Sequence, residues 1–485
     1  MTTQSGVEAK SQAWQDNIGK WQLNRLLENS DITLCKNWKQ HLFYPERWSA
    51  DPLAQQRHQD FIDGAALFPA LKKTLDGSLG VVFRKPTKIE LSAGLEYLNE
   101  NTDGNSKGLE QFTQDVVSEN LLQGYGGILT DFAASDDALS KADDVLMNRF
   151  ATMHIYNAES IINVYTIKVG AVTVVQQIVL EEDYQDRVGQ FSVETKKQYR
   201  VLYLDENGQY IQQIYRLEDD NADINSGLYE QYEPRNSRGE RLDYIPFAFF
   251  GAESNTWYPT GSPLYDLARM NAKHLEYSAM RNESIRQLAP TMFAFPGENF
   301  DYEEFETNNP KGITMGGYNA YLLGAGGSVD LLQASANDAA VAEMQHVESL
   351  MVQAGALLIT PQSSNVSTET TIIQRSTETS VLGMVVRNSE EAIELSLQWV
   401  ADYMGVTGES TLDINREFFS VPLSAQDRAQ WAQEVMMGLV TADEFRTALV
   451  KSGNLPDSAL DEEIFLDATP EQDDEPEDED LDGNE

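Results

Sequence analysis

The chain has 485 residues, of which 41% are hydrophobic and 23% charged, and its formal net charge at pH 7 is -43. A chain of this length can bury a sizeable core and form several domains. Its single cysteine, Cys35, excludes a framework of internal disulfides and is typical of a reducing compartment. The N-terminus lacks the apolar core of a signal peptide, and no run is apolar enough to span a membrane. We therefore expect a soluble protein made in the cytoplasm.

The acidic excess belongs to the body of the chain as well as to its end. Residues 456–485 hold 15 acidic residues and no Lys or Arg, which predicts a disordered acidic tail. The remaining 455 residues still carry 63 acidic against 35 basic side chains. Affinity for nucleic acid depends on Lys and Arg, which release counterions from the phosphates. The composition therefore argues against a protein that grips DNA, and leaves open one that touches DNA without holding it.

The first part of the chain, residues 1–64, is predicted to be a helical segment. Trp14, Ile18 and Trp21 recur at helical spacing and mark one apolar face. The simplest interpretation of such a face is packing against the rest of the protein.

A glycine-containing stretch, DGSLGVVFRKP, begins at Asp76 and raises the question of a phosphate-binding loop. Such a loop needs GxxxxGK followed by Ser or Thr, whereas Lys85 is followed by Pro86 and the hydroxyl is missing. The stretch instead predicts a helix that ends near Leu75 at a glycine cap, followed by a short strand over residues 81–83.

The region 65–262 mixes helical and strand patterns. The segment from Gly108 to Phe132 predicts a helix, a glycine turn and a strand, and departs too far from GxGxxG to imply a dinucleotide site. Alternating patterns predict further strands over 160–169, 172–182, 200–206 and 209–218. The last two are joined by Asn207-Gly208, a pair typical of a type I′ hairpin turn.

Two helices flanking an irregular insert follow. The first is predicted over 263–289, because Ser262 suits the N-cap, Pro263 suits the first helical position, and Pro290 stops the helix. The insert 290–333 contains short strand-like pieces and an acidic segment. The second helix is predicted over 334–357, with an apolar stripe formed by Ala340, Met344, Val347, Met351 and Ala354.

The rest of the chain is predicted to be mostly helical. An uncharged break spans 358–366, and the region 367–420 holds a long helix from about 367 to Met404, stopped by Gly405, and a following strand. Residues 421–455 contain two short helices with capping patterns at Ser424 and Thr441. Their acidic residues favour a plain helical hairpin over a DNA-reading helix-turn-helix, since groove readers are basic.

The order of long helix, small β insert, second helix, uncharged loop and longer third helix resembles the portal (head-to-tail connector) proteins of tailed bacteriophages. Over about residues 65–405 the chain is similar, in order, to a portal-like family that long lacked an assigned function. No single motif is diagnostic, and the ordered series carries the resemblance: LDGSLGVVFRKP, GLEYL, LEQFTQDVVSENLLQGYGGILTDF, YNAESIINVY, DYIPFAFFG and GSPLYDLA.

The resemblance implies an α+β portal fold with a mixed wing, long stem helices, a small β-containing clip and a helical crown. The implied parts are a wing (65–262), a stem helix (263–289), a clip (290–333), a second stem helix (334–357), a tunnel loop (358–366), a long wing helix with a following strand (367–420) and a crown (421–455). The N-terminal segment 1–64 fits the family less well. The resemblance also implies that the stretch DGSLGVVFRKP is a structural turn that binds no phosphate.

The resemblance also implies a function. Portal proteins form a ring, typically a dodecamer, at one capsid vertex, through which double-stranded DNA enters during packaging and leaves during ejection. The expected partners are further copies of the chain, the terminase large subunit, a head-tail adaptor, and the major capsid and scaffolding proteins, with transient non-specific DNA contact and no membrane. The expected location is the portal vertex of the virion, assembled in the host cytoplasm. No catalytic residue, cofactor or metal is implied, because terminase hydrolyses ATP.

The distribution of charge fits a channel independently of the family. Between Gly312 and Gln374 there is no Lys or Arg, while five acidic residues are present: Asp330, Asp338, Glu343, Glu348 and Glu369. Duplex DNA carries a negative charge about every 1.7 Å, so a basic wall would hold it and an acidic wall would let it slide. Helical spacing allows only some of these acids to face a lumen, and a solvated face of an ordinary helix remains the alternative. The candidates for lining the channel are Glu343 and Glu348.

Two further sets of residues are expected to make contacts. In the tunnel loop, Gln362, Ser363, Ser364 and Asn365 would touch DNA through neutral polar groups, although a simple interhelix turn explains them as well. In the clip, an acidic insert that we expect to be exposed would bind the adaptor and terminase through Tyr302, Glu303, Glu304, Glu306 and Lys311.

Two other classes of protein compete with the portal hypothesis. An acidic DNA mimic or other minor virion protein would bind a nucleic-acid-binding partner without forming rings. A hydrolase would have to use carboxylate pairs, since the sequence has no GxSxG motif and its histidines show no metal-binding spacing: His41, His58, His154, His274 and His346.

Overall fold

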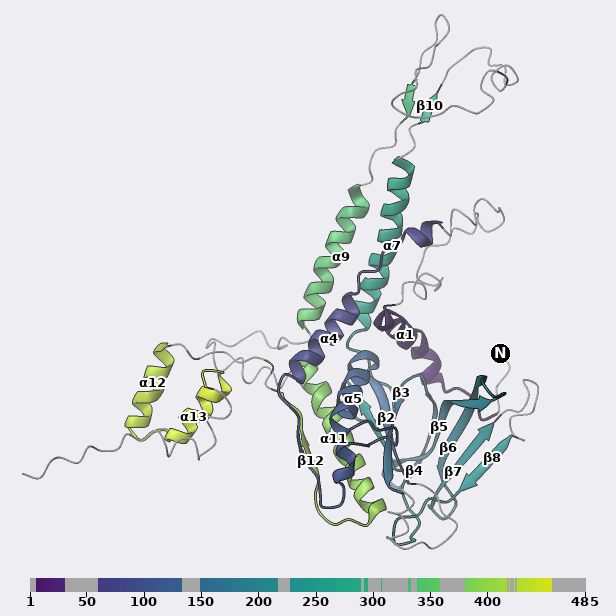
Figure 1. Cartoon of the computed structure of the whole chain (residues 1–485), viewed down its shortest axis with the longest axis vertical. Helices are drawn as coiled ribbons and strands as arrows, with labels where there is room; N and C mark the ends of the chain where they lie inside the picture. The colour runs from purple at the N-terminus through teal and green to yellow at the C-terminus, as the bar shows by residue number, and fades with distance from the viewer. Residues whose placement is uncertain are drawn as a thin grey trace, which may run out of the picture. The chain divides into compact units, whose positions relative to one another are not determined.

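The computed structural model describes a mixed helix-and-sheet protein (Figure 1). The described residues are 6–30, 60–132, 149–216, 227–288, 292–294, 307, 330–332, 338–357, 380–416, 418, 423 and 425–455. The chain divides into two compact units, the first formed by Met1–Gln362 with Thr379–Arg416 and the second by Ser363–Glu378 with Glu417–Glu485. None of the helices in these described ranges is long and apolar enough to cross a bilayer.

A three-stranded antiparallel sheet lies at the centre of the first unit. Strand β2 (Tyr125–Phe132) is flanked by β3 (Ala151–Asn157) and β9 (Phe247–Gly251). Helix α5 (Leu109–Gln123) and helix α11 (Val381–Met404) pack on this sheet. Gly124 ends α5 with a φ of 70° and leads directly into β2. The predicted helix, glycine turn and strand are therefore confirmed.

A second sheet of five antiparallel strands has the order β4-β5-β6-β7-β8. These strands span Ile161–Val169, Val172–Arg187, Val193–Leu204, Tyr210–Arg216 and Leu228–Tyr232. The alternating sequence patterns predicted the presence of four of them, but β5 runs to Arg187 instead of 182 and β6 begins at Val193 instead of 200. One face of the sheet buries Ile162, Val179, Tyr199 and Val201, against which Val7 and Trp14 pack from the N-terminal segment.

The hairpin between β6 and β7 forms as predicted, but its turn is of a different type. A type I′ turn needs positive φ at both central residues. Gly208 has a φ of 76°, whereas Asn207 does not adopt positive φ. The loop is instead held by Asp205, whose Oδ1 accepts hydrogen bonds from the backbone N–H groups of Asn207 (2.8 Å) and Gln209 (2.9 Å). The Asp205 carboxylate therefore stabilises this loop in place of the backbone hydrogen bonds of a two-residue type I′ turn.

Helix α4 (Ala70–Val82) corrects the prediction of a helix end near Leu75 and a strand over 81–83. The helix continues through both glycines because Leu71, Leu75, Ser78 and Val82 form a buried stripe at helical spacing. Burial of this stripe outweighs the low helix propensity of glycine, which is worth only about 1 kcal/mol per residue.

The continuity of α4 makes a testable difference at Gly77 and Gly80. A Cβ added at either position would meet no atom within 4 Å, and neither glycine has positive φ. Alanine at each position is therefore expected to raise the free energy of unfolding by about 0.5–1 kcal/mol. Urea unfolding of the two variants measures this. A glycine cap at either site would give the opposite sign, and Gly124→Ala, where φ is positive and a Cβ would lie 2.4 Å from the Gly261 oxygen, is the matched destabilising control.

Helix α1 (Gln12–Asn29) confirms the predicted helix around Trp14 and Trp21. Trp21 is buried, and Trp14 is half-buried with its Nε1–H donating to the backbone oxygen of Glu159 (2.9 Å). The two tryptophans therefore dock α1 onto the rest of the first unit, as a packing face should. Small elements in the described part of the unit include the 3-10 helix η2 (Glu96–Asn99) and the pair β1 (Lys88–Glu90) with β12 (Thr411–Asp413).

The second unit contains a helical hairpin formed by α12 (Ala425–Met436) and α13 (Ala442–Lys451). The predicted capping pattern at Thr441 is confirmed, because its hydroxyl accepts from the Glu444 N–H and the Glu444 carboxylate accepts from the Thr441 N–H. The rings of Trp431 and Phe445 stack at 6.1 Å between the two helices. Ser424 and the acidic tail lie outside the described residues.

Candidate functional site: the paired helices α7 and α9

Two long helices, α7 (Tyr265–Leu288) and α9 (Asp338–Leu357), lie side by side in the first unit (Figure 1). They correspond to the helices predicted over residues 263–289 and 334–357, although α7 begins two residues after Pro263. Ser262 is therefore not the N-cap that the sequence predicted. Its hydroxyl accepts from the Leu264 N–H (3.3 Å), ahead of the helix, and donates to the Leu122 oxygen (2.8 Å). Between the two helices in sequence, β10 (Met292–Ala294) and β11 (Asp330–Leu332) form an antiparallel pair. The predicted strand pieces of the insert are thus present.

The contact between the helices uses the predicted apolar stripe of α9. Val347 and Met351 are 8% and 3% exposed, while the adjacent Val352 is 73% exposed. The facing helix α7 buries mainly small and aliphatic side chains: Leu267, Ala268, Ala272, Leu275 and Ala279. Small side chains on a helix allow a neighbouring helix to approach closely. The pair therefore has one defined rotational setting.

This setting places the two candidate channel acids in different surroundings. Glu343 is exposed. Glu348 reaches across to α7, where its Oε1 lies 3.0 Å from Nε2 of the buried His274. With Nε2 protonated, the imidazole donates to the carboxylate, and Glu348 becomes part of the helix–helix contact while 45% of its side chain stays exposed.

The two helices differ in charge. Helix α9 contains three acidic residues and no Lys or Arg, whereas α7 contains four basic and three acidic residues. On α7, Lys273 Nζ lies 2.6 Å from Glu276, and Arg269 lies 3.9 Å from Asp266. The basic residues of α7 are thus offset by its own acids, and the net negative charge of the pair belongs to α9.

A row of polar residues on α7 has a role that the sequence analysis missed. Asn271 accepts from the Leu71 N–H (3.1 Å) and donates to the Phe68 oxygen (2.8 Å), and the Ser278 hydroxyl accepts from the Ala66 N–H (2.8 Å). Asn282 donates to the backbone oxygen of Gly64. These bonds hold the segment before α4 along α7. Their helical spacing was visible in the sequence, but polar residues at that spacing are equally typical of a solvated face.

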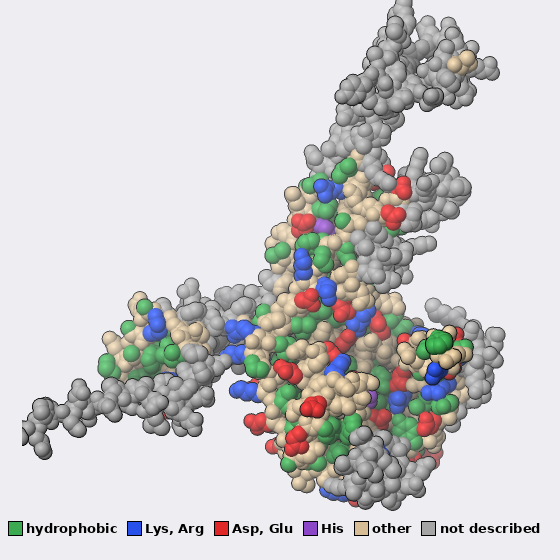
Figure 2. All heavy atoms as spheres, in the orientation of Figure 1, with side chains coloured by type: hydrophobic (Ala, Val, Ile, Leu, Met, Phe, Trp, Pro, Cys, Tyr) green, Lys and Arg blue, Asp and Glu red, His purple; other side chains and the backbone are tan. Residues whose placement is uncertain are grey.

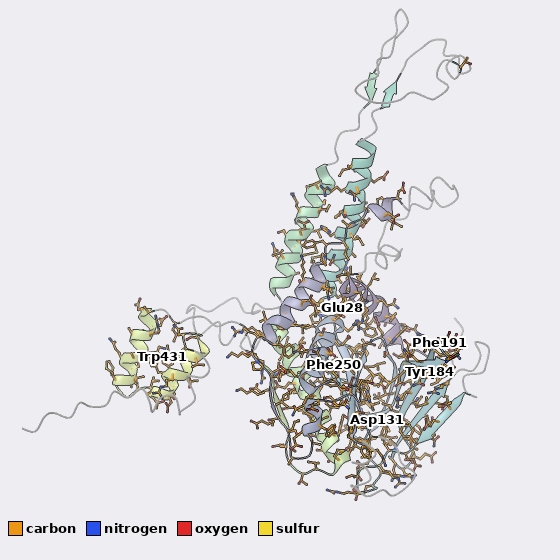
Figure 3. The ribbon with its side chains drawn as sticks, viewed as in Figure 1. Glu28, Asp131, Tyr184, Phe191, Phe250 and Trp431 are labelled. Atoms are coloured by element: carbon orange, nitrogen blue, oxygen red, sulfur yellow. The ribbon has the colours of Figure 1, made fainter. Side chains whose placement is uncertain are left out.

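A second missed feature is a polar cluster between the two sheets of the first unit, near Asp131 (labelled in Figure 3). Arg200 Nε donates to Glu182 Oε1 at 2.6 Å, and the hydroxyl of Tyr156 donates to the same oxygen at 2.5 Å. Gln212 links Arg200 to Asp131. The side chains of Glu182 and Arg200 are only 13% and 16% exposed. This ion pair therefore lies in the interior and connects β5 and β6 to β2 and β3.

The electrostatics of this cluster favour the charged pair. Burial alone would raise the pKa of Glu182, but the charge of Arg200 and hydrogen bonds from Arg200, Tyr156 and Gln198 lower it below its ordinary value. Burial, followed by the neighbouring Glu182 carboxylate, raises the pKa of the Tyr156 hydroxyl. Glu182 therefore stays ionised and Tyr156 keeps its proton near neutral pH, which preserves the bonds between β5, β6 and β3. In the described part of the chain, no group of three or more His, Cys, Asp or Glu side chains could hold a metal ion.

The other candidate site residues lie outside the described residues. They are the tunnel-loop set Gln362, Ser363, Ser364 and Asn365, and the clip set Tyr302, Glu303, Glu304, Glu306 and Lys311. The third helix was predicted from about residue 367, but α11 begins at Val381, because the Ser380 hydroxyl accepts from the Gly383 N–H and caps it there. Its predicted stop at Gly405, with a φ of 61°, is confirmed.

Comparison with known proteins finds a family match over this part of the chain. Residues 263–404, which include α7, α9 and α11, match a family described as "Domain of unknown function (DUF4055)". No curated protein sequence matches the chain.

Three solved structures are similar over most of their length. A chain in "Neck of empty GTA particle computed with C6 symmetry" is 14% identical, with a TM-score of 0.41, and the match covers 79% of this chain and 90% of that one. A chain in "Neck of native GTA particle computed with C12 symmetry" is 13% identical, with a TM-score of 0.41, and the match covers 79% of this chain and 89% of that one. A chain in "Virion of native gene transfer agent (GTA) particle" is 14% identical, with a TM-score of 0.41, and the match covers 83% of this chain and 94% of that one.

Proposed function

We propose that the chain is a portal subunit, and that twelve copies form the ring through which double-stranded DNA passes at one capsid vertex. The observation that carries this proposal is the α7–α9 pair, in which the second helix is acidic and free of Lys and Arg. The order of α7, β10–β11, α9 and α11 agrees with the stem, clip, stem and wing helix that the resemblance implies.

The proposed role follows from the charge of α9. A ring of α9 helices would present many carboxylates and no fixed cations to a passing duplex. Because DNA carries about one negative charge every 1.7 Å, such a wall repels the backbone and prevents ion pairs that would stall its movement. Glu343 is exposed on α9 and is the residue we place at the lumen. Glu348 is held by His274, so its main role is in the pairing of the helices.

In this proposal the chain has no catalytic residues and binds no cofactor. Terminase hydrolyses ATP and docks with the head-tail adaptor on the clip, while the capsid and scaffolding proteins hold the ring at the vertex. The interior ion pair of Glu182 and Arg200 keeps the wing sheets together under the load of packaging.

Reversing the charge at Glu343 tests the channel role. Glu343→Lys in every subunit is expected to leave ring formation intact and to slow packaging severalfold, because a ring of ammonium groups would bind phosphates. The measurement is the amount of DNA protected from nuclease in proheads over time, at two salt concentrations. Added salt should restore part of the rate, because it screens the ammonium–phosphate attraction.

Two controls define this experiment. Glu110→Lys changes an exposed acid on α5 by the same charge, and Glu343→Gln removes the acid without adding a base. Packaging by Glu343→Lys at the rate of the Glu110→Lys control would show that Glu343 does not face the DNA.

A further inference from the structure

The five-stranded sheet ends in a projecting two-stranded ribbon. Strand β5 pairs with β4 only as far as Leu180, and β6 pairs with β7 only from Gln198. Between these limits, β5 and β6 pair only with each other among the described strands, from Asp183↔Lys197 to Arg187↔Val193. We call residues 183–197 the β5–β6 arm. Its base is anchored, since the guanidinium of Arg216 lies 4.3 Å from the centre of the Tyr184 ring.

The tip of the arm is apolar and open to solvent. Phe191 is 92% exposed, and Val188 and Val193 are 65% and 59% exposed. Figure 3 labels Phe191 at the end of the sheet, and Figure 2 shows hydrophobic side chains gathered there beside Lys and Arg. An isolated two-stranded ribbon is only marginally stable in water. An aromatic side chain at its tip contributes a favourable free energy only when it is buried. The arm therefore has the features of a segment that docks on something.

The charges of the arm are balanced, unlike those of the chain. It contains three acidic and three basic residues, whereas the whole chain has a net charge of -43. Lys196 pairs with Asp186 at 2.8 Å within the arm, and Arg187 donates to the backbone oxygens of Gly189 and Gln190. A neutral arm can approach an acidic surface without the repulsion that other surfaces of this chain would meet. The charge of the arm therefore does not oppose its docking on a second copy of the chain.

A candidate acceptor lies on the same unit. A small cavity of about 60 Å³ is lined mainly by aromatic side chains from α1, β2 and the loop before α7, with β4 along one side: Trp14, Trp21, Tyr125, Val164, Trp257 and Tyr258. Trp257 and Tyr258 are 37% and 53% exposed. Aromatic walls favour an aromatic occupant, because ring pairs contribute beyond the area that they bury. We call this cavity the aromatic pocket.

The arm does not reach the aromatic pocket of its own chain. Val164 in the pocket pairs with Ile178 of β5, and the tip residue Val188 lies ten residues further along an extended strand. At about 3.3 Å per residue, the tip is on the order of 30 Å from its own pocket. Donor and acceptor are therefore different surfaces of one subunit, as a head-to-tail contact requires.

We propose that Phe191 at the tip of the β5–β6 arm docks in the aromatic pocket of a neighbouring copy of this chain. Repeated from subunit to subunit, this heterologous contact generates a closed ring if the rotation between copies closes. The inference rests on the proposed portal function for the ring, but the contact between copies is a separate statement and is tested separately.

A pair of cysteines tests the contact directly. In a Cys35→Ser background, Phe191→Cys and Tyr258→Cys are combined in one chain and the protein is oxidised. Because each copy then carries one donor and one acceptor, the expected result is a ladder of cross-linked species beyond the dimer on non-reducing gels. Each single variant can give at most a dimer, and Asn207→Cys with Tyr258→Cys moves the donor cysteine to the exposed β6–β7 turn as the matched control.

A second variant measures the contribution of the contact. Phe191→Ser is expected to raise the concentration needed for half-assembly by about tenfold or more, since it removes a buried aromatic side chain from every interface. The unfolding midpoint of the isolated chain should not change, because Phe191 is almost fully exposed there. This separates a loss of assembly from a loss of folding.

The outcomes separate this inference from the proposed function. Rings of the unmodified chain without the 191–258 ladder, and unaffected by Phe191→Ser, overturn the inference and leave the portal proposal standing. A ladder without closed rings supports the contact and counts against the portal proposal. If neither closed rings nor the cross-linked ladder form up to the highest soluble protein concentration, the inference is overturned.

Discussion

Replacing Arg200 with alanine is expected to lower the free energy of unfolding of the first unit by about 3–5 kcal/mol at pH 7. The change leaves the carboxylate of Glu182 in the interior without the guanidinium that lies 2.6 Å from it. The Tyr156 hydroxyl and the Gln198 amide remain as partners, but neither carries a charge. Urea unfolding followed by tryptophan fluorescence measures the loss.

The pH dependence of this variant identifies the cause. In the unmodified chain the pKa of Glu182 lies below its ordinary value of 4.5, so its stabilisation is present above that pH and is lost as pH falls through the folded-state pKa. In Arg200→Ala burial still raises the pKa of Glu182, and only the neutral hydrogen bonds from Tyr156 and Gln198 still lower it, so the carboxylate takes up a proton at higher pH than in the unmodified chain. The difference between the two proteins should therefore shrink on acidification. A difference that stays constant from pH 7 to pH 4 would show that lost packing, and not charge, is responsible.

A surface ion pair provides the comparison for Arg200. Lys196 lies 2.8 Å from Asp186, with side chains 37% and 47% exposed. Lys196→Ala is expected to leave the unfolding midpoint nearly unchanged, because solvent screens such pairs.

The second large effect is expected in the contact between α7 and α9. Met351→Glu places a carboxylate at a position that is 3% exposed, on a helix that packs against α7. A buried charge without a partner costs at least about 3 kcal/mol, so α9 should separate from α7 before the rest of the unit unfolds. Limited proteolysis and hydrogen exchange across residues 338–357 should show early opening of this helix.

The neighbouring residue gives a matched control for Met351. Val352→Glu introduces the same side chain one residue further, where the native side chain is 73% exposed. Its effect on the stability of the isolated chain should stay within about 0.5 kcal/mol. Equal protease sensitivity of the two variants would contradict the packing of α9 on α7.

The elements that the sequence predicted well are those defined by local patterns. Alternation identified four of the five strands of the larger sheet, and the cap at Thr441 and the stop at Gly405 follow from side chains within one turn of each helix end. The errors arose where distant contacts decide. Helix α4 continues through Gly77 and Gly80 because its stripe is buried against other helices, which no local rule reports.

The candidate site was predictable in outline but not in detail. The stripe around Val347 and Met351 was visible as a helical period, and so was the absence of Lys and Arg on α9. The contact of His274 is made by Glu348 and not by Glu343. This choice depends on how α9 is rotated against α7, a helix about 74 residues earlier in the chain. The interior pair of Glu182 and Arg200 was hidden for the same reason. In a chain with 78 acidic residues, sequence alone does not indicate which carboxylates are buried.

Electron microscopy of the purified chain in negative stain, with native mass measured on the same sample, tests the central claim most directly. The portal proposal predicts closed rings with a central hole wide enough for a DNA duplex, and a mass corresponding to twelve copies. A particle that stays monomeric across salt and protein concentration, and also when expressed together with its scaffolding protein, would contradict the proposal and favour an acidic DNA mimic or a carboxylate-dependent hydrolase.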